Sequence, residues 1–283
     1  MAIEIGGIGV WTVPRAWAHG ALPEVAAELE DLGFGAFWLG GSPGGELRQI
    51  EELLEATKRM PIATGIANVW NDPPETLVAA YHRLTAAHPG RFLLGIGAGH
   101  HERTGRYAWP YRRLVEFLDA FDAGGVPVEH RVLAALGPRV LALAARRAAG
   151  AHPYLVTPEH TRRARVVLGP DRLLAPEQKV LLETDPGRAR AAARESLALY
   201  LQLPNYTTNL RRLGYAEEDL AYGGSDRLVD DLVAWGDEDA IRARIAAHHR
   251  AGADHVAVQV LNRGSERLPA HRTLAPALLD LRR

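Results

Sequence analysis

Residues 62–100, IATGIANVWNDPPETLVAAYHRLTAAHPGRFLLGIGAGH, contain the pattern that decides the fold. Two short apolar runs, Ile62–Val69 and Phe92–Ile96, are each typical of a buried strand. Between the two runs, apolar residues recur at helical spacing: Leu77, Tyr81 and Leu84. The stretch therefore predicts one strand–helix–strand unit, which favours a parallel sheet.

The same alternation of short apolar runs and amphipathic segments extends along the whole chain. Eight apolar runs are candidates for buried strands: Ile5–Trp11, Ala36–Leu39, Ile62–Val69, Phe92–Ile96, Val132–Leu136, Tyr154–Val156, Val180–Glu183 and His255–Leu261. A chain of 283 residues falls in the range of one α/β barrel domain. We therefore predict a single-domain (β/α)₈ barrel over residues 1–283, with an open parallel sheet as the alternative.

Helix starts are marked by an N-cap acceptor followed by proline, at Asp72-Pro73-Pro74-Glu75, Thr157-Pro158-Glu159 and Asp185-Pro186. Each of these starts closely follows a predicted strand. The loops that contain them therefore belong to the C-terminal face of the barrel, where barrel enzymes hold their active sites.

The stretch from Pro186 to Asp254 is longer than one crossover helix, and glycines divide it. It predicts several helices inserted before the last strand, over the mouth of the active site. Within it, His248 and His249 follow a helical pattern and are expected at the surface.

Composition excludes several classes of function. The formal net charge of −1, from 33 basic and 34 acidic residues, offers no general attraction to nucleic acid or anionic membrane. Only Lys58 and Lys179 are lysines, and the arginines alternate with acidic residues, as is typical of solvated helix faces. The absence of cysteine excludes disulfides, thiolate catalysis and Cys-ligated zinc. Met1–Val10 lacks the features of a signal peptide and no apolar stretch could cross a bilayer, so we expect a cytoplasmic protein.

Gly65 and Asn68 stand at the end of the third predicted strand. Gly65 has no side chain, so the backbone there can approach a flat ring closely. Asn68 offers both a donor and an acceptor to the heteroatoms of such a ring. The alternative is an ordinary strand with one glycine at a bend.

The fourth predicted strand ends in alternating glycines and then in polar residues. Gly95, Gly97 and Gly99 do not match the dinucleotide-binding fingerprint, and they leave room for either a ligand or a close neighbour. His100, with His101 and Glu102, could supply a general acid or base. A metal site is the weaker alternative because adjacent residues seldom converge on one ion, so no metal is predicted; an exposed loop is the other reading.

Two further features suit a bound ligand. Gly137-Pro138-Arg139 follows the fifth predicted strand and opens a helix, whose free N–H groups and nearby guanidinium could bind an anion, although a simple helix start would look the same. Trp11, Trp38 and Trp70 fall at or near strand ends. They could line a substrate pocket and stack on a flat ring, or they could be core packing.

These segments together resemble the luciferase-like monooxygenase superfamily, and within it the F420-dependent oxidoreductases. The resemblance spans almost the whole chain and is most specific over Thr64–Asn68 and Pro89–Gly99, with further likeness at Gly137–Arg139 and Pro153–Glu159. It implies a (β/α)₈ barrel, usually a homodimer, that binds coenzyme F420 or, alternatively, FMN at the C-terminal face.

The resemblance also implies roles for single residues. A non-prolyl cis peptide at Gly65–Ile66 would lie behind the cofactor ring, with Asn68 at the polar edge of that ring. The cofactor cleft would be lined by Gly97, Ala98 and Gly99. The phosphate end of the cofactor would lie near Gly137 and Arg139.

One departure from the family's pattern concerns the second strand. Several deazaflavin enzymes carry an acidic residue there, often followed by histidine, whereas this strand ends in Leu39-Gly40-Gly41-Ser42. The best-known acid–base pair of the family therefore has no counterpart, and His100 and Glu102 are the catalytic candidates that replace it.

The leading hypothesis is hydride transfer between a deazaflavin and a small organic substrate, whose identity the sequence does not give. An FMN-dependent monooxygenase is the nearest alternative. A non-catalytic flavin-binding protein is another. A phosphate-binding aldolase or isomerase would need a catalytic lysine or paired carboxylates at strand ends, and only Lys179 and Glu183 come near to this.

Overall fold

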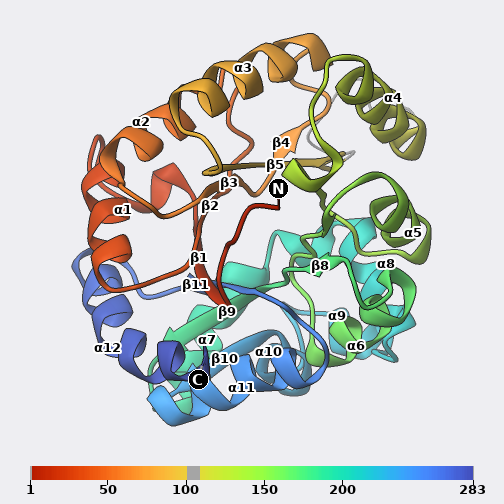
Figure 1. The fold of residues 1–283 in the computed structure, drawn as a ribbon. Helices are drawn as coiled ribbons and strands as arrows, with labels where there is room; N and C mark the ends of the chain where they lie inside the picture. Colours follow the sequence, from red (N-terminus) through yellow and green to blue (C-terminus); the bar gives the residue numbers. More distant parts are fainter. Residues whose placement is uncertain (1, 101–108, 283) are drawn as a thin grey trace.

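The computed structural model describes residues 2–100 and 109–282, and it shows a curled sheet of parallel strands surrounded by helices (Figure 1). The strands are β1 (Ile8–Thr12), β2 (Phe37–Leu39), β3 (Ile62–Thr64), β4 (Ala67–Asn68), β5 (Phe92–Gly97), β6 (Arg131–Leu133), β7 (Gly150–Ala151), β8 (Leu173–Leu174), β9 (Glu177–Leu182), β10 (Val233–Gly236) and β11 (Val256–Val260). The longer helices are α1 (Leu22–Asp31), α2 (Arg48–Ala56), α3 (Pro74–Ala87), α4 (Pro110–Ala123), α5 (Pro138–Arg147), α6 (Pro158–Leu168), α7 (Pro186–Leu197), α8 (Pro204–Arg212), α11 (Glu238–Arg250) and α12 (Arg267–Leu279).

The sheet closes on itself. Its hydrogen-bonded order is β10-β9-β11-β1-β2-β3-β5-β6-β7-β8, with β4 paired to β5. Only Ala175 and Pro176 separate β8 from β9, so the two form one nearly continuous strand. Its first part pairs with β7 and its second part with β11, which joins the two ends of the strand order. The Ala175 N–H donates to Ala151 O at 2.9 Å, and the Ala257 N–H donates to Pro176 O at 2.9 Å. The predicted TIM-type barrel is therefore confirmed, with β10 as an added strand beside β9.

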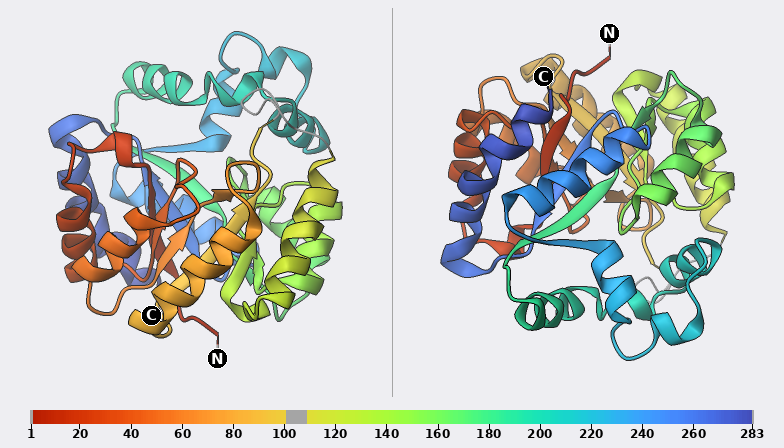
Figure 2. Two further views of the ribbon diagram at one scale, coloured as in Figure 1. Left: turned by 90° about the horizontal axis from the view of Figure 1, so that it is seen from above. Right: turned by 90° about the horizontal axis from the view of Figure 1, so that it is seen from below.

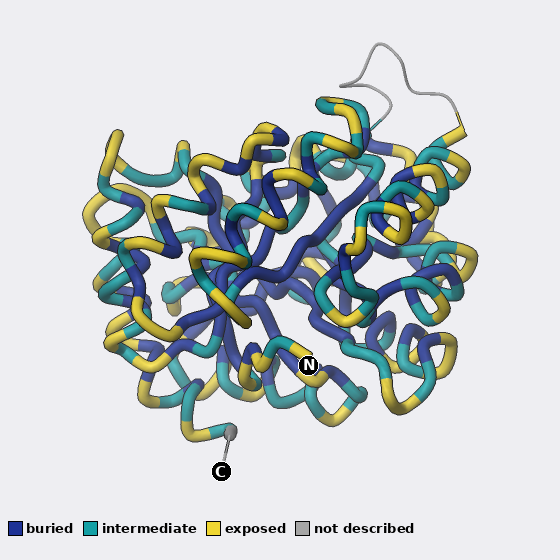
Figure 3. The backbone as a smooth tube through the Cα atoms, turned by 45° about the horizontal axis from the view of Figure 1, so that its top comes forward, coloured by how far each residue is buried: buried dark blue, intermediate teal, exposed yellow. Residues whose placement is uncertain are grey.

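Most strand residues are buried, and the strands are the dark blue centre of Figure 3. They are buried on both faces because helices cover the outside of the barrel and side chains fill its inside. β1 and β5 are buried along their whole length. Trp11, Trp38 and Val132 belong to the apolar cluster inside the barrel. This two-sided burial is the reason that most strands are continuous apolar runs in the sequence.

Two predicted strands differ from the structure. The run Ile62–Val69 is divided into β3 and β4 by a cis peptide bond at Gly65–Ile66. The prediction of a strand at Tyr154–Val156 is wrong: the strand is β7, a few residues earlier, and Leu155 has a left-handed φ of 58°. Pro153, which has no N–H group to donate, and this left-handed residue end the extended backbone before the apolar run begins.

The segment between β9 and β11 contains α7, η4 (Tyr200–Gln202), α8, α9 (Glu217–Leu220), α10 (Asp226–Leu232), β10 and α11. Its first helices stand beyond one end of the strands in both views of Figure 2. The predicted insertion of several helices before the last strand is confirmed, and the segment also contains one strand, β10, which pairs with β9. The expectation that His248 is exposed is wrong: it is fully buried and hydrogen-bonds through Nε2 to Gln178 Oε1 at 2.9 Å.

Two of the three predicted helix caps are confirmed. Thr157 Oγ1 accepts from the His160 N–H, and Asp185 Oδ1 accepts from the Arg188 N–H. The third is wrong, because the Asp72 carboxylate accepts instead from the Gly45 N–H at 2.8 Å, where it holds the preceding loop. Within residues 2–100 and 109–282, no helix has the length and apolar character needed to cross a membrane.

Candidate functional site

A cavity of about 770 Å³ opens at the C-terminal ends of the strands. Its walls come from segments that follow β1, β4, β5, β6 and β7, and from the inserted η4 and α8. Most of the predicted site residues that the structure describes meet here: Trp11, Gly65, Ile66, Asn68, Ala98, Gly99, His100, Gly137 and Arg139. The position that barrel geometry assigns to an active site is thus occupied by the residues that the sequence singled out.

The backbone at Gly65 is packed against the end of β1. The predicted cis peptide is present at Gly65–Ile66, and Trp11 Nε1 donates to Gly65 O at 3.2 Å. A Cβ at position 65 would lie 2.7 Å from Trp11 Nε1, which no side chain can do without moving the indole. Gly65 and Ile66, between β3 and β4, form a bulge in the backbone. Glycine is required at position 65 to keep both the Trp11 indole and this bulge in place.

Gly97 makes room for the bulge and does not line the cavity. A Cβ at position 97 would lie 2.9 Å from both Ile66 Cγ1 and Ala134 Cβ. Its neighbours Ala98 and Gly99 do line the cavity. Of the two readings of the alternating glycines, close packing holds for Gly97.

Asn68 is held in place by one end of its amide and is free at the other. Its Oδ1 accepts from the Trp70 N–H at 3.1 Å, and Trp70 Nε1 in turn donates to Ala98 O at 2.8 Å. Among the residues that the structure describes, none accepts a hydrogen bond from Asn68 Nδ2. This donor is therefore available to a ligand, whereas Trp70 braces the wall from behind.

Trp38 lies outside the lining of the cavity. It is fully buried inside the barrel, donates from Nε1 to His255 Nε2 at 3.0 Å, and stacks on His152 with ring centroids 4.1 Å apart. Of the three tryptophans proposed for a substrate pocket, only Trp11 belongs to the cavity wall.

One end of the cavity is cationic. Gly137 is the N-cap of α5, and the exposed Arg139 follows it, with its guanidinium 4.7 Å from the Tyr111 ring centroid. Arg212, from the inserted α8, places Nη1 3.1 Å from where a Gly137 Cβ would stand. Arg15 also lines the cavity, and no acidic side chain of the described chain does. A helix N-terminus with unpaired arginines favours an anionic ligand group.

One of the two predicted catalytic residues, His100, belongs to the cavity wall. Its ring centroid lies 5.4 Å from that of Tyr206. Glu102, like His101, lies outside the described residues.

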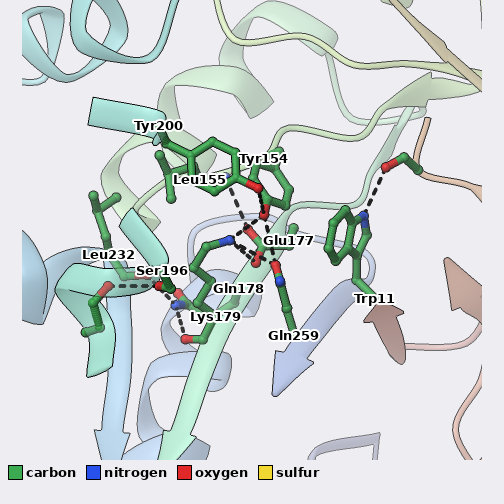
Figure 4. Close-up of polar contacts among 12 residues, drawn as sticks. Trp11, Tyr154, Leu155, Glu177, Gln178, Lys179, Ser196, Tyr200, Leu232 and Gln259 are labelled. Carbon is green, nitrogen blue, oxygen red and sulfur yellow. Dashed lines mark hydrogen bonds and ion pairs between the residues drawn. The ribbon is translucent and has the colours of Figure 1, made fainter. Parts of the chain in front are cut away.

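A buried polar cluster below the cavity was not predicted as a site (Figure 4). Lys179 and Glu177, each 1% exposed, form an ion pair of 3.0 Å on the inward face of β9. Lys179 Nζ also donates to Tyr154 Oη at 2.7 Å and to Gln259 Oε1 at 2.9 Å. Burial raises the pKa of Glu177, although the neighbouring ammonium opposes this, and burial also raises the pKa of the Tyr154 phenol.

The same cluster connects to the cavity through two tyrosines. Tyr154 and Tyr200 both line it, and their hydroxyl oxygens are 2.9 Å apart. All three N–H donors of Lys179 have acceptors, and its side chain does not line the cavity. Lys179 is therefore not placed to serve as the reactive lysine of an aldolase.

His152 is a further residue that the sequence did not single out. Its Nδ1 lies 2.7 Å from Ala175 O, which makes Nδ1 the protonated nitrogen. Burial lowers its pKa to about 4, so the ring is neutral near pH 7. No group of three or more side chains able to hold a metal ion comes together in the described part of the chain.

Comparison with known proteins agrees with this fold. The model of the luciferase-like monooxygenase family matches residues 8–131. No curated protein matches the chain significantly in sequence.

Several solved structures are similar over nearly their full length. An F420-dependent secondary alcohol dehydrogenase in complex with an F420–acetone adduct has 14% identity and a TM-score of 0.76, covering 96% of this chain and 99% of that one. The coenzyme F420-dependent tetrahydromethanopterin reductase of Methanopyrus kandleri has 13% identity and a TM-score of 0.72, covering 99% and 100%. The FMN-bound oxygenating constituent of 3,6-diketocamphane monooxygenase from Pseudomonas putida has 14% identity and a TM-score of 0.70, covering 96% and 98%. At these identities the likeness concerns the fold.

Proposed function

We propose that this chain is an oxidoreductase that binds coenzyme F420 in the 770 Å³ cavity and transfers hydride between it and a small organic substrate. The observation that carries the proposal is the division of the cavity into two ends. One end has aromatic and glycine-rich walls around Trp11 and Ile66, and the other has Arg139 and Arg212 beside a helix N-terminus. This division suits a ligand with a flat ring and an anionic tail.

The residues present fit such a cofactor. Arg139, Arg212 and the start of α5 would hold its phosphate, and the free Nδ2 of Asn68 would donate to a heteroatom of its ring. When bound, the deazaflavin supplies the hydride chemistry. The protein positions the two reactants and excludes water, and His100 stands in the wall as a candidate for proton transfer.

FMN is the alternative cofactor, and a monooxygenase the alternative activity. The family model carries that name, and one similar structure holds FMN. The cavity features named above would serve either ring. We favour F420 because Thr64–Asn68 and Pro89–Gly99 resemble the F420-dependent branch.

The test is a titration of the purified protein with F420 and, separately, with FMN, followed by the absorbance and fluorescence of each ring. Micromolar or tighter binding of F420, with FMN clearly weaker, would support the proposal. Preference for FMN would move the assignment to a monooxygenase, with oxygen consumption as the next measurement. Binding of neither compound would remove the cofactor assignment.

Two neighbouring arginines provide a matched pair of variants for this titration. Arg212→Ala removes the guanidinium next to Gly137 and should weaken cofactor binding about tenfold or more, because hydrogen bonds to charged groups are strong. Arg211→Ala removes an exposed arginine that is paired with Glu217 and should leave the affinity unchanged. Equal losses in the two variants would contradict the assignment of the cationic end of the cavity to the phosphate of the cofactor.

A further inference from the structure

The wall formed by η4 and the segment after β7 contains a short chain of hydrogen bonds that ends at the cavity (Figure 4). Lys179 Nζ lies 2.7 Å from Tyr154 Oη, and Tyr154 Oη lies 2.9 Å from Tyr200 Oη. The lysine is buried beneath the cavity, whereas both phenol rings line it. The chain therefore runs from a buried charge to a surface that a ligand can touch.

The direction of proton donation is fixed at the buried end of this series of hydrogen bonds. An ammonium can only donate, so Tyr154 Oη accepts from Lys179. Tyr154 then has two acceptors for its own proton, Tyr200 Oη at 2.9 Å and Gln259 Oε1 at 3.0 Å. Gln259 Oε1 already accepts from Lys179, so Tyr200 is the acceptor that no other group occupies. When Tyr154 donates to Tyr200, the proton of Tyr200 has no acceptor among the described residues and is left for a ligand.

The buried end is itself held in place. Glu177 Oε1 accepts from Lys179 at 3.0 Å, and Glu177 Oε2 accepts from the Leu155 N–H at 3.1 Å. Gln259 Oε1 takes the third proton of the ammonium at 2.9 Å. Hydrogen bonds in such a chain polarise one another, so the last hydroxyl becomes a stronger donor than an isolated phenol.

We propose that Tyr200, in place of His100, is the catalytic proton donor of this enzyme, and that its substrates are carbonyl compounds whose oxygen receives this proton. The inference rests on the proposed hydride chemistry. A bound deazaflavin would supply hydride to the electrophilic carbon, and the π electrons of the double bond would then move to the oxygen. The oxygen takes the proton of Tyr200, and the hydrogen bond from Tyr154 stabilises the phenolate that this leaves. Solvent in the cavity then returns a proton to Tyr200, which lines it.

Neutral His152 does not compete for this role. Its single N–H is on Nδ1 and is directed to Ala175 O, while its Nε2 is buried. Tyr206 is a better comparison with Tyr200, because its ring packs edge-on against the Tyr200 ring at 5.4 Å. The hydroxyl of Tyr206, however, hydrogen-bonds to no residue of the described ranges, and so it lies outside the chain that leads to Lys179.

The test uses 4-nitrophenol, whose anion carries an oxygen like that of the developing alkoxide and absorbs visible light. The purified protein is titrated with it, first without and then with F420. Wild-type protein should bind the anion about tenfold or more tightly than Tyr200→Phe, since a hydrogen bond to a charged oxygen is lost. Tyr154→Phe should show a smaller loss, because Tyr200 remains but is no longer polarised. Tyr206→Phe should bind as the wild type does.

Equal affinity of wild type and Tyr200→Phe, including no binding by either, would overturn the proposal. Equal losses in Tyr200→Phe and Tyr206→Phe would also overturn it, because general packing would then explain both. The first titration needs no cofactor. Its failure therefore removes the donor role alone, whereas failure to bind F420 or FMN removes the proposed function.

Discussion

Replacing Lys179 with methionine should destabilise the fold strongly, because it leaves Glu177 buried without its partner. Both side chains are 1% exposed, and among the described residues the lysine alone donates from a side chain to Glu177 Oε1. Breaking a buried ion pair by removing one partner costs about 3–5 kcal/mol. We therefore expect Lys179→Met to lower the free energy of unfolding by roughly this amount near pH 8.

The size of this effect should depend on pH, with a sign that follows from Glu177. Burial raises the pKa of this carboxyl, and Lys179 is the main influence that lowers it again. In Lys179→Met the folded state therefore keeps the proton at pH values where the unfolded chain has lost it. More protons bound in the folded state mean that stability falls as pH rises above the ordinary glutamate pKa. The deficit of the variant should be smaller at pH 5 than at pH 8.

The assay is guanidinium unfolding at these two pH values, followed by circular dichroism and tryptophan fluorescence. Lys58→Met is the matched control, because Lys58 is the only other lysine and is exposed; it should change stability by less than about 0.5 kcal/mol. The double variant Glu177→Leu/Lys179→Met should recover most of the loss, since two apolar residues replace the pair. A Lys179→Met deficit that is the same at both pH values, and that the double variant does not recover, would refute this reasoning.

Three further changes test other parts of the structure. Gly97→Ala places a Cβ 2.9 Å from Ile66 Cγ1, so it should cost about 1–3 kcal/mol of stability and weaken cofactor binding, as guanidinium unfolding and F420 titration would show. Burial lowers the pKa of His248 to about 3, so stability should fall as pH drops below the ordinary histidine value, by about 1.4 kcal/mol per pH unit for this group. His248→Gln should reduce that slope between pH 6 and pH 4, and an unchanged slope would contradict the assignment. Trp38→Phe should lower stability, because the hydrogen bond to His255 is lost, and it should leave the affinity for F420 unchanged. A large loss of affinity would contradict the conclusion that Trp38 lies outside the cavity wall.

The strands that the sequence predicts well are those buried on both faces. β2, β5 and β11 are found within a residue or two of the expected runs, because helices outside and side chains inside require apolar residues at every position. β7 is displaced because Gly150 and Ala151 carry too little side chain to form an apolar run. The apolar run that follows it, around Leu155, packs instead against the inserted helices.

The sequence predicts those residues of the site that lie at or just after the C-terminal ends of strands. Gly65, His100 and Arg139 each follow a strand closely and Asn68 ends one, and the barrel brings all such ends to one face. Arg212 and Tyr200 could not be found in this way, because they come from inserted helices whose placement over the mouth depends on tertiary packing. For Tyr154 and Lys179 a signal existed, since Glu177 and Lys179 lead directly into the apolar run that begins at Val180, and charged residues in a buried strand need buried partners.

The Glu177–Lys179 pair is better explained by the hydrogen-bond donor that it fixes than by a gain in stability. Burying two charges costs free energy that their attraction repays only in good geometry, and an apolar pair of similar volume is often as stable. A lysine whose three protons are all taken cannot rotate, so it presents one fixed N–H to Tyr154. That fixed donor makes Tyr154 Oη an acceptor, so the Tyr154 proton is directed away from the lysine, to Tyr200 or to Gln259. An apolar pair would leave both hydroxyls free to turn. The stability of the double variant and its affinity for 4-nitrophenol should therefore separate: the first recovers, and the second stays low.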